Sequence, residues 1–118
     1  MPFPICGAVG AVLHSALDGV AERQRVIADN IANVDTPGYR ATSVDFESSL
    51  RAAIASGDVS SEAASTTIAT NTPVGANGNN VDLRKETMAA VQSQFQYQML
   101  TRAVSDRFDL IRTAAGGQ

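Results

Sequence analysis

The feature that most constrains this chain is a run of apolar or tolerated polar residues spaced alternately four and three positions apart. Such a heptad pattern places all its members on one side of an α-helix and forms a seam for packing against a second helix. The seam residues are Leu13, Leu17, Val20, Gln24, Ile27, Ile31 and Val34. We therefore predict a helix over about 9–34.

The positions between the seam residues carry most of the charge in this segment. Glu22 and Arg25 are three residues apart, and Arg25 and Asp29 are four apart, so both pairs can form ion pairs on a helix surface. Together with Asp18 and Arg23, they predict a solvated face on the side away from the seam.

A second apolar pattern predicts a helix over about 82–115, with Asp82 as its N-cap and Gly116 and Gly117 as its stop. At about 1.5 Å per residue, this helix would be roughly 50 Å long. Its apolar residues form two stripes: Met88, Val91, Phe95, Met99 and Ala103 in the first, and Tyr97, Leu100, Val104, Phe108, Ile111 and Ala115 in the second. Because one antiparallel helix cannot cover both, we expect one contact within the subunit and at least one outside it.

The first helix must end near Asn33 or Val34, because Thr36 precedes a proline and is pushed out of the helical region. Pro37 and Gly38 suit the two central positions of a type II turn. Asn33 can tolerate a left-handed C-terminal position, and the amides of Asn30 and Asn33 can satisfy local backbone groups.

After this turn, residues 39–44 are expected to be extended, and Asp45 to cap a short helix that stops at Gly57. Phe46, Leu50 and Ile54 share one face of that helix. Residues 56–80 are rich in Ser, Thr, Ala, Asn and Gly, so they are predicted to be an irregular loop ordered only by contacts with the rest of the molecule or with neighbours. The fold class predicted is mainly α: two long terminal helices packed as a coiled-coil-like pair, joined by a turn, a short helix and an irregular loop (about 35–80).

Length, composition and charge limit the size of the core and the classes of partner that this chain can have. A chain of 118 residues with 4 Phe, 2 Tyr and no Trp has room for one modest domain and a thin core, so 1–118 is expected to form a single domain. A net charge of -3 argues against a nucleic-acid partner. The single Cys6 cannot form an internal disulfide. The uncharged first 17 residues are too short to span a bilayer and lack the basic start of a cleaved leader, so no membrane insertion is expected.

The sequence shows no arrangement of residues that is typical of a catalytic, metal or cofactor site. His14 has no metal-ligand spacing to Cys6 or to a carboxylate, and residues 7–10 lack the third glycine of a dinucleotide site. The Asn-rich tract at 77–80 lacks the alternating acidic ligands of a calcium loop. The carboxylates are scattered over predicted solvent faces. We therefore expect no enzyme activity, no catalytic residue, no metal and no cofactor.

The most informative segment runs from Asp29 to Arg40 and reads Asp-Asn-Ile-Ala-Asn-Val-Asp-Thr-Pro-Gly-Tyr-Arg. It closely resembles the signature of flagellar axial proteins, the rod and hook family, which has the form Asn-Asn-Ile-Ala-Asn-Val-x-Thr-Pro-Gly-Tyr. The resemblance covers 13–40, 78–83, 94–101 and 108–114, and is weakest at about 56–77 and in the first few residues. Hook and distal rod proteins carry large inserted domains, for which this chain has no room, so it is most similar to the short members of the proximal rod.

This resemblance implies a structural subunit of the bacterial flagellar basal body, exported from the cytoplasm by the flagellar type III apparatus without a cleaved signal peptide. It implies that the terminal helices assemble into a torque-transmitting shaft with other copies, other rod proteins and membrane-ring and export-gate junction proteins at the rod base. The expected turn residues are Asn30, Ile31, Ala32, Asn33, Thr36, Pro37, Gly38 and Tyr39. The expected packing residues are Leu13, Leu17, Val20, Ile27, Ile31, Phe95, Leu100, Val104, Phe108 and Ile111.

The segment Phe46-Glu47-Ser48-Ser49-Leu50 further resembles the element that early rod and hook substrates present to the export gate, with Phe46 and Leu50 as the recognised residues. The equal alternative is that these residues simply pack a short amphipathic helix. For the whole chain, the alternative is a cytoplasmic coiled-coil adaptor or secretion chaperone, which would share the apolar stripes and never leave the cell. A peripheral membrane protein ranks lower because the helix faces lack an excess of Lys and Arg, and a small hydrolase ranks last.

Overall fold

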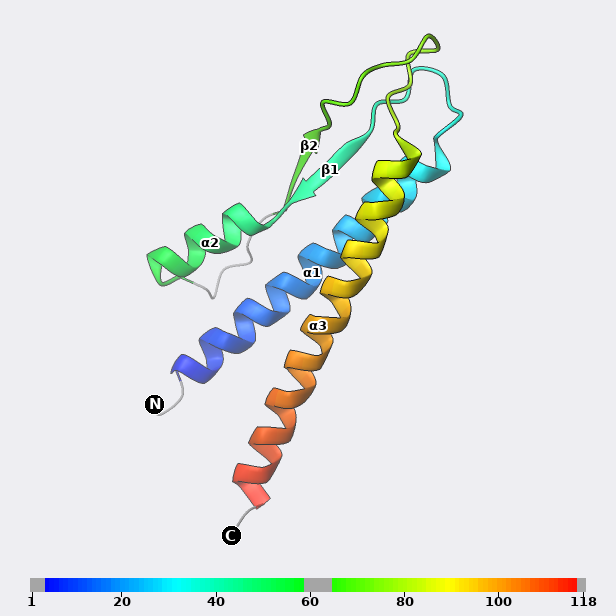
Figure 1. The fold of residues 1–118 in the computed structure, drawn as a ribbon. Coiled ribbons are helices and arrows are strands. Elements are labelled where there is room, and N and C mark those ends of the chain that lie inside the picture. Colours follow the sequence, from blue (N-terminus) through cyan, green and yellow to red (C-terminus); the bar gives the residue numbers. More distant parts are fainter. Residues whose placement is uncertain (1–3, 59–64, 117–118) are drawn as a thin grey trace.

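The computed structural model describes residues 4–58 and 65–116, and the side chains from Gly7 onward within those ranges. Two long helices, α1 (Pro4–Ala32) and α3 (Leu83–Gly116), pack against each other and give the molecule extents of 67 × 27 × 14 Å. They lie closest near the turn that follows α1 and separate toward the two chain ends (Figure 1). The predicted pair of terminal helices is therefore confirmed, with α1 starting about five residues earlier than expected.

A small layer packs on the side of α1 away from α3 (Figure 1). It consists of strand β1 (Thr42–Asp45), helix α2 (Glu47–Ser56) and strand β2 (Thr66–Ala69). The two strands pair antiparallel, with Thr42 opposite Ala69 and Asp45 opposite Thr66. Helix α1 therefore lies between two layers and buries parts of two faces.

The expectation that 56–80 is an irregular loop is wrong for residues 66–69, which form β2. One edge of this segment's backbone is satisfied by ladder hydrogen bonds to β1 and by an extension in which the Thr70 N–H donates to the Ala41 carbonyl (3.2 Å). Thr66 and Thr67 are β-branched and favour an extended backbone. Strand pairing thus orders residues 66–69, although Ile68 is their only large apolar side chain and is exposed; residues 59–64 lie outside the described part.

The helix boundaries follow the expected signals. The Asp82 carboxylate accepts the N–H of Lys85 (3.2 Å) and so caps α3. The Asp45 carboxylate accepts the N–H of Ser48 (3.1 Å) at the start of α2, and Gly57 ends α2 with φ of 79°.

The core is thin and lies where α1 meets β1 and α2. Its buried members are Ala16, Val20, Val26, Val44 and Phe46, with Leu50 and Leu100 packed against it. On α3, Ser93 is fully buried, and its hydroxyl has no hydrogen-bond partner among the described residues. Most of the large apolar residues of α3 are exposed and lie outside this core.

Candidate assembly interface

The signature segment forms a tight turn at one end of the molecule. The Tyr39 N–H donates to the Thr36 carbonyl (3.2 Å), and Gly38 has φ of 76°, as the third position of a type II turn requires. The turn predicted at Pro37 and Gly38 is thus confirmed. Asn33 does not adopt the left-handed conformation that it could tolerate, because every described residue with positive φ is a glycine. The Asn33 amide instead donates to the Asp29 carbonyl (2.8 Å) within the last turn of α1.

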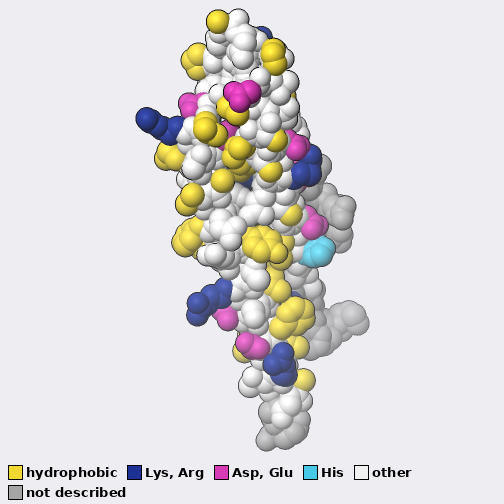
Figure 2. Space-filling model, turned by 90° about the vertical axis from the view of Figure 1, so that its right-hand side faces the viewer, with side chains coloured by type: hydrophobic (Ala, Val, Ile, Leu, Met, Phe, Trp, Pro, Cys, Tyr) yellow, Lys and Arg dark blue, Asp and Glu magenta, His cyan; other side chains and the backbone are white. Residues whose placement is uncertain are grey.

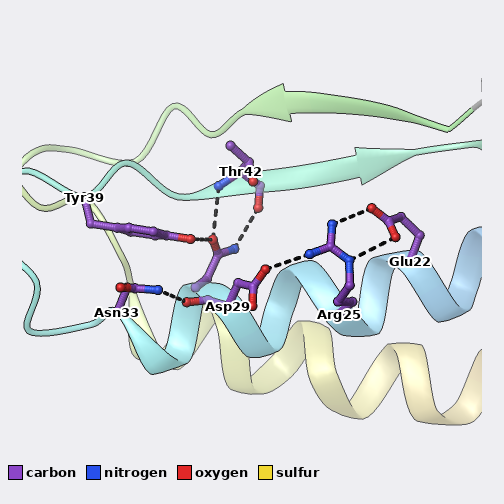
Figure 3. Close-up of polar contacts among 7 residues, drawn as sticks. Glu22, Arg25, Asp29, Asn33, Tyr39 and Thr42 are labelled. Atoms are coloured by element: carbon purple, nitrogen blue, oxygen red, sulfur yellow. Dashed lines mark hydrogen bonds and ion pairs between the residues drawn. The ribbon is translucent and has the colours of Figure 1, made fainter.

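Asn30 joins four parts of the chain. Its Nδ2 donates to the Thr42 carbonyl and to the Glu86 carboxylate, both at 2.7 Å, while its Oδ1 accepts the Thr42 N–H and the Tyr39 hydroxyl, both at 3.2 Å. The side chain is completely buried. Figure 3 draws the Tyr39 hydroxyl and the Thr42 backbone with the dashed lines of these hydrogen bonds. Because it both donates to and accepts from Thr42, the amide imitates the backbone of a neighbouring strand. The partners of Asn30 therefore lie in other elements, beyond the local backbone groups that the sequence indicated.

Two further asparagines, Asn79 and Asn80, bond the segment that leads into α3 to this turn. The Asn79 Nδ2 donates to the carbonyls of Asn33 and Thr36 (both 2.8 Å), and the Asn80 Oδ1 accepts the Ala41 N–H (2.6 Å). Both carbonyls also accept a backbone N–H of the turn, from Thr36 and Tyr39, so Asn79 adds a second hydrogen bond to each. The side chains of Asn79 and Asn80 therefore hold the start of α3 against the end of α1.

Glu86 is a buried carboxyl at the base of this junction, although the sequence placed the carboxylates on solvent faces. It is only 5% exposed and accepts the bond from Asn30. Burial raises the pKa of Glu86 above its usual 4.5, against the lowering effects of the Asn30 hydrogen bond and of Lys85; Asp82 adds to the rise. Burial also raises the pKa of the Tyr39 hydroxyl, helped by the charges of Asp29 and Glu86. The junction therefore carries one carboxyl that is destabilised when charged.

A Glu86→Gln change is expected to raise the thermal midpoint at neutral pH. A carboxyl with a raised folded-state pKa stabilises the protein fully below 4.5 and loses that stabilisation as pH rises through the folded pKa. A glutamine oxygen can accept the same Asn30 bond without the charge, so the gain over the wild type should appear only above that pH. Thermal melts of both proteins between about pH 4 and 8, a range that begins near the ordinary pKa of Glu, measure the difference in thermal midpoint.

Glu47→Gln serves as the control with the opposite sign. The Arg23 guanidinium hydrogen-bonds both oxygens of Glu47 (2.6 and 2.8 Å) and holds its pKa below the usual 4.5. That stabilisation is present above 4.5 and is lost as pH falls through the folded pKa. The Glu47 variant should therefore be less stable than the wild type at neutral pH and approach it in acid. A Glu86 variant that behaved in the same way would contradict the assignment of Glu86.

Arg23 is the second polar junction and was wrongly assigned to the solvated face. Its side chain is 18% exposed, and besides Glu47 it donates to the Val44 carbonyl (2.7 Å) and to Gln96 (3.2 Å). Its guanidinium carbon also lies 4.8 Å from the centre of the Phe46 ring. One side chain thus ties α1 to β1, α2 and α3. The pairs predicted from Arg25 to Glu22 (2.6 Å) and to Asp29 (2.9 Å) are confirmed on the exposed face (Figure 3).

The α1 residues buried against the small layer and α3 follow a sequence pattern of their own, which is less apparent than the apolar seam. They repeat at the same alternating spacing of three and four, one position removed from the seam, and all but Val26 are small or polar. They are Ala16, Gly19, Arg23, Val26 and Asn30. A heptad search that scored small and hydrogen-bonding residues would have found a second packing face on α1.

The outer face of α3 carries an uncovered apolar stripe, which we define as Met88, Val91, Phe95 and Met99. These side chains are 57–67% exposed. They lie on the side of α3 opposite Ser93 and Leu100, which face α1. Figure 2 shows apolar side chains along the length of the molecule on this side, with charged groups between and beside them. The first predicted stripe is therefore left without an intrasubunit partner.

The C-terminal part of α3 is a second uncovered region. Phe108, Leu110 and Ile111 are 61%, 70% and 47% exposed, in the region where the two helices separate (Figure 1). Gly10 of α1 still approaches the Arg107 side chain, so contact between the helices reaches at least that far. The second predicted stripe is thus covered near Leu100 and Val104, and open beyond them.

The remaining predicted residues are placed as follows. Among the packing residues, Val20 and Ile27 are buried, whereas Leu13, Leu17, Ile31, Leu100 and Val104 are half-buried and Phe95, Phe108 and Ile111 are exposed. Among the turn residues, Ala32, Thr36, Pro37 and Gly38 are exposed at the tip of the molecule. Phe46 is 5% exposed and Leu50 half-buried, both packed in the core.

The described part of the chain shows neither a metal-binding cluster nor a membrane-spanning helix. In the part of the chain that the structure describes, no three His, Cys, Asp or Glu side chains come together in a way that could hold a metal ion. None of the described helices combines the length and the apolar character needed to cross a membrane. His14 lies 3.7 Å from Asp18 on the exposed face of α1.

Residues 12–40, which hold Asn30 and the turn, match the family described as flagella basal body rod protein. Over nearly the whole chain, the sequence is also similar to flagellar basal body rod proteins FlgB. The protein of Bacillus subtilis (strain 168) is 36% identical over 117 residues, which cover 89% of this chain and 91% of that protein. Those of Escherichia coli (strain K12) and Borreliella burgdorferi (strain B31) are 37% and 31% identical, covering 78% and 83% of this chain and 81% and 88% of their own lengths. This chain belongs to the FlgB family of flagellar basal body rod proteins.

Proposed function

We propose that this protein is a structural subunit of the proximal rod, where it packs side by side with other copies and with other rod proteins to form a torque-transmitting shaft. The observation that carries this proposal is the α3 stripe, whose four large apolar side chains are each more than half exposed. Monomeric soluble proteins rarely leave such a contiguous surface uncovered, and an apolar helix face is suited to burial against another helix.

The polar junctions support a mechanical role. Asn30 and Arg23 each bond to several elements, so α1, the turn and the start of α3 are cross-linked by short hydrogen bonds. Buried and satisfied polar networks of this kind favour one arrangement of the elements over others. A subunit that holds one shape under load passes force to its neighbours instead of deforming.

The open end of the helix pair supplies a further contact. Phe108, Leu110 and Ile111 are exposed in the region where α1 and α3 separate, so a neighbour's helix can pack between or against them. Contacts at both the stripe and this end would bury the apolar residues that the thin core leaves outside. We assign such contacts to other copies and other rod proteins, and those at the rod base to membrane-ring and export-gate junction proteins.

The route to the rod is proposed to be type III export without a cleaved leader, with Phe46 and Leu50 recognised at the export gate. In the folded subunit, Phe46 is buried against Gly19 and under Arg23. Recognition of Phe46 therefore requires a chain in which α2 has not yet docked. The same side chain then serves as a core residue after assembly. No catalysis, nucleic-acid binding or membrane insertion forms part of this role.

The test is whether the protein is located in the basal body and needed there. A chromosomal copy with an internal tag should co-purify with detergent-extracted basal bodies, and its deletion should abolish swimming and leave no rod. A protein found only in the cytoplasm, with normal rods in its absence, would instead indicate an adaptor or chaperone.

A further inference from the structure

Strand β2 forms an exposed edge of the small sheet. All four of its residues are exposed, including Ile68 at 46%, and the sheet contains only β1 and β2 among the described residues. Its sequence, Thr-Thr-Ile-Ala, has no charge, proline or glycine. Natural edge strands usually carry such residues to prevent pairing with other chains. Apart from its shortness, β2 lacks these protections.

The pairing register shows which backbone groups of β2 are free. Ser43 lies opposite Ile68, and the Thr70 N–H donates to the Ala41 carbonyl, so alternate pairs of the ladder exchange hydrogen bonds. The backbone groups of the intervening β1 residues point away from β2. Those of Thr42, for example, bond the Asn30 side chain on that side of the strand. The residue opposite Val44 is Thr67 and the one opposite Thr42 is Ala69. The N–H and C=O groups of Thr67 and Ala69 therefore point away from β1, along the outer edge of the sheet.

The opposite edge of the sheet is already used. The side chains of Asn30 and Arg23 bond the backbone of Thr42 and Val44 there, so β1 has partners on both sides. No strand lies beside the outer edge of β2 in the described part of the chain. A ribbon of two strands is marginal by itself and gains stability from a third strand.

We propose that the outer edge of β2 binds an extended, uncharged segment of an adjacent rod subunit, which adds a third strand to the sheet. This inference rests on the proposed assembly into the rod. Donor and acceptor pairs repeating every second residue fit only an extended backbone, and an uncharged partner matches an uncharged edge. Two identical β2 edges would pair about a two-fold axis and close into a dimer, whereas a rod grows through contacts between different surfaces.

The decisive variant is Thr67→Pro, with Thr67→Ala as its matched control. Proline removes the outward N–H of residue 67 and leaves the inward bonds of residues 66 and 68, and it is tolerated at an edge position whose N–H faces solvent. The purified Pro variant should keep the wild-type circular dichroism spectrum and thermal midpoint. Its amount in isolated basal bodies should fall about tenfold or more, because a neighbour's carbonyl is left without its donor. The Ala variant should assemble normally.

Hydrogen exchange of the wild-type chain gives a second measurement that does not depend on how the variant folds. In the isolated protein, the amides of Thr66 and Ile68 should be protected and those of Thr67 and Ala69 should exchange freely. In assembled basal bodies, exchanged and then dissociated under quench conditions, all four should be protected.

The outcomes separate this inference from the proposed function. Absence of the wild-type chain from basal bodies would refute the rod role itself. Its presence, with equal incorporation of the Pro variant or free exchange at Thr67 and Ala69 in the rod, would refute only the strand addition. A concentration-dependent dimer of the purified protein that Thr67→Pro abolishes would assign the edge to a second copy and also overturn the inference.

Discussion

Replacing Gly19 with alanine is expected to lower the free energy of unfolding by about 2–3 kcal/mol, in the range of overpacked cores. A Cβ at this position would lie 2.2–2.6 Å from three carbons of the Phe46 ring. The ring cannot simply retreat, because it is 5% exposed and the Arg23 guanidinium lies 4.8 Å from its centre. In a chain of this size the thermal midpoint should fall by about 8–20 °C.

Gly7→Ala is the matched control for this prediction. Gly7 is also in α1, but a Cβ there would meet nothing within 4 Å. Because alanine is the better helix former, this change should be neutral or stabilise by up to about 1 kcal/mol. Denaturant unfolding of both variants gives the two free energies. Stabilisation by Gly19→Ala similar to that by Gly7→Ala would contradict the docking of Phe46 on α1.

The second large effect is expected from Phe95→Asp, which should leave the subunit folded and abolish its assembly. Phe95 is 62% exposed, so the free energy of unfolding of the isolated protein should change by no more than about 0.5 kcal/mol. In an interface that buries the α3 stripe, losing a phenylalanine and burying a charge removes about 3 kcal/mol or more per contact, or roughly a hundredfold in association. Swimming should be lost in cells that carry only this variant.

Gln94→Asp is the control, since it places the same charge on an exposed polar position of α3, on the helix side that also carries Gln98 and Thr101. It should swim normally. The readouts are soft-agar motility and the amount of protein in isolated basal bodies, with a melting curve of each purified variant. Normal assembly of the Phe95 variant would show that the stripe is not an interface.

These two predictions also mark how far the sequence could be interpreted alone. The long helices follow from periodicity that a single chain displays openly, such as Leu17, Val20 and Ile27 on α1. The turn follows from local stereochemistry at Pro37 and Gly38. The exposure of one α3 stripe follows from geometry, since one partner helix covers only one side.

What could not be predicted depends on contacts between distant residues. Gly19 looks like a weak point in a helix until the chain returns and places Phe46 over it. Arg23 and Glu86 look like surface charges, because no local pattern indicates that Glu47 and Asn30 will reach them. Strand β2 has a single large apolar residue, Ile68, which is exposed, and the order of the strand comes from pairing with β1. In each case a tertiary partner, unknown from local sequence, decided the environment.

The most direct test of the account measures whether the α3 stripe is buried on assembly. Met88 and Met99 belong to the stripe and are 65% and 57% exposed in the subunit, so they should oxidise readily in the purified protein. In intact basal bodies, the account predicts sulfoxide formation at both residues at least about tenfold slower, because the neighbouring helices exclude the oxidant from the thioethers. Equal oxidation rates in the free and assembled protein would contradict the central claim that the rod is held together through this face.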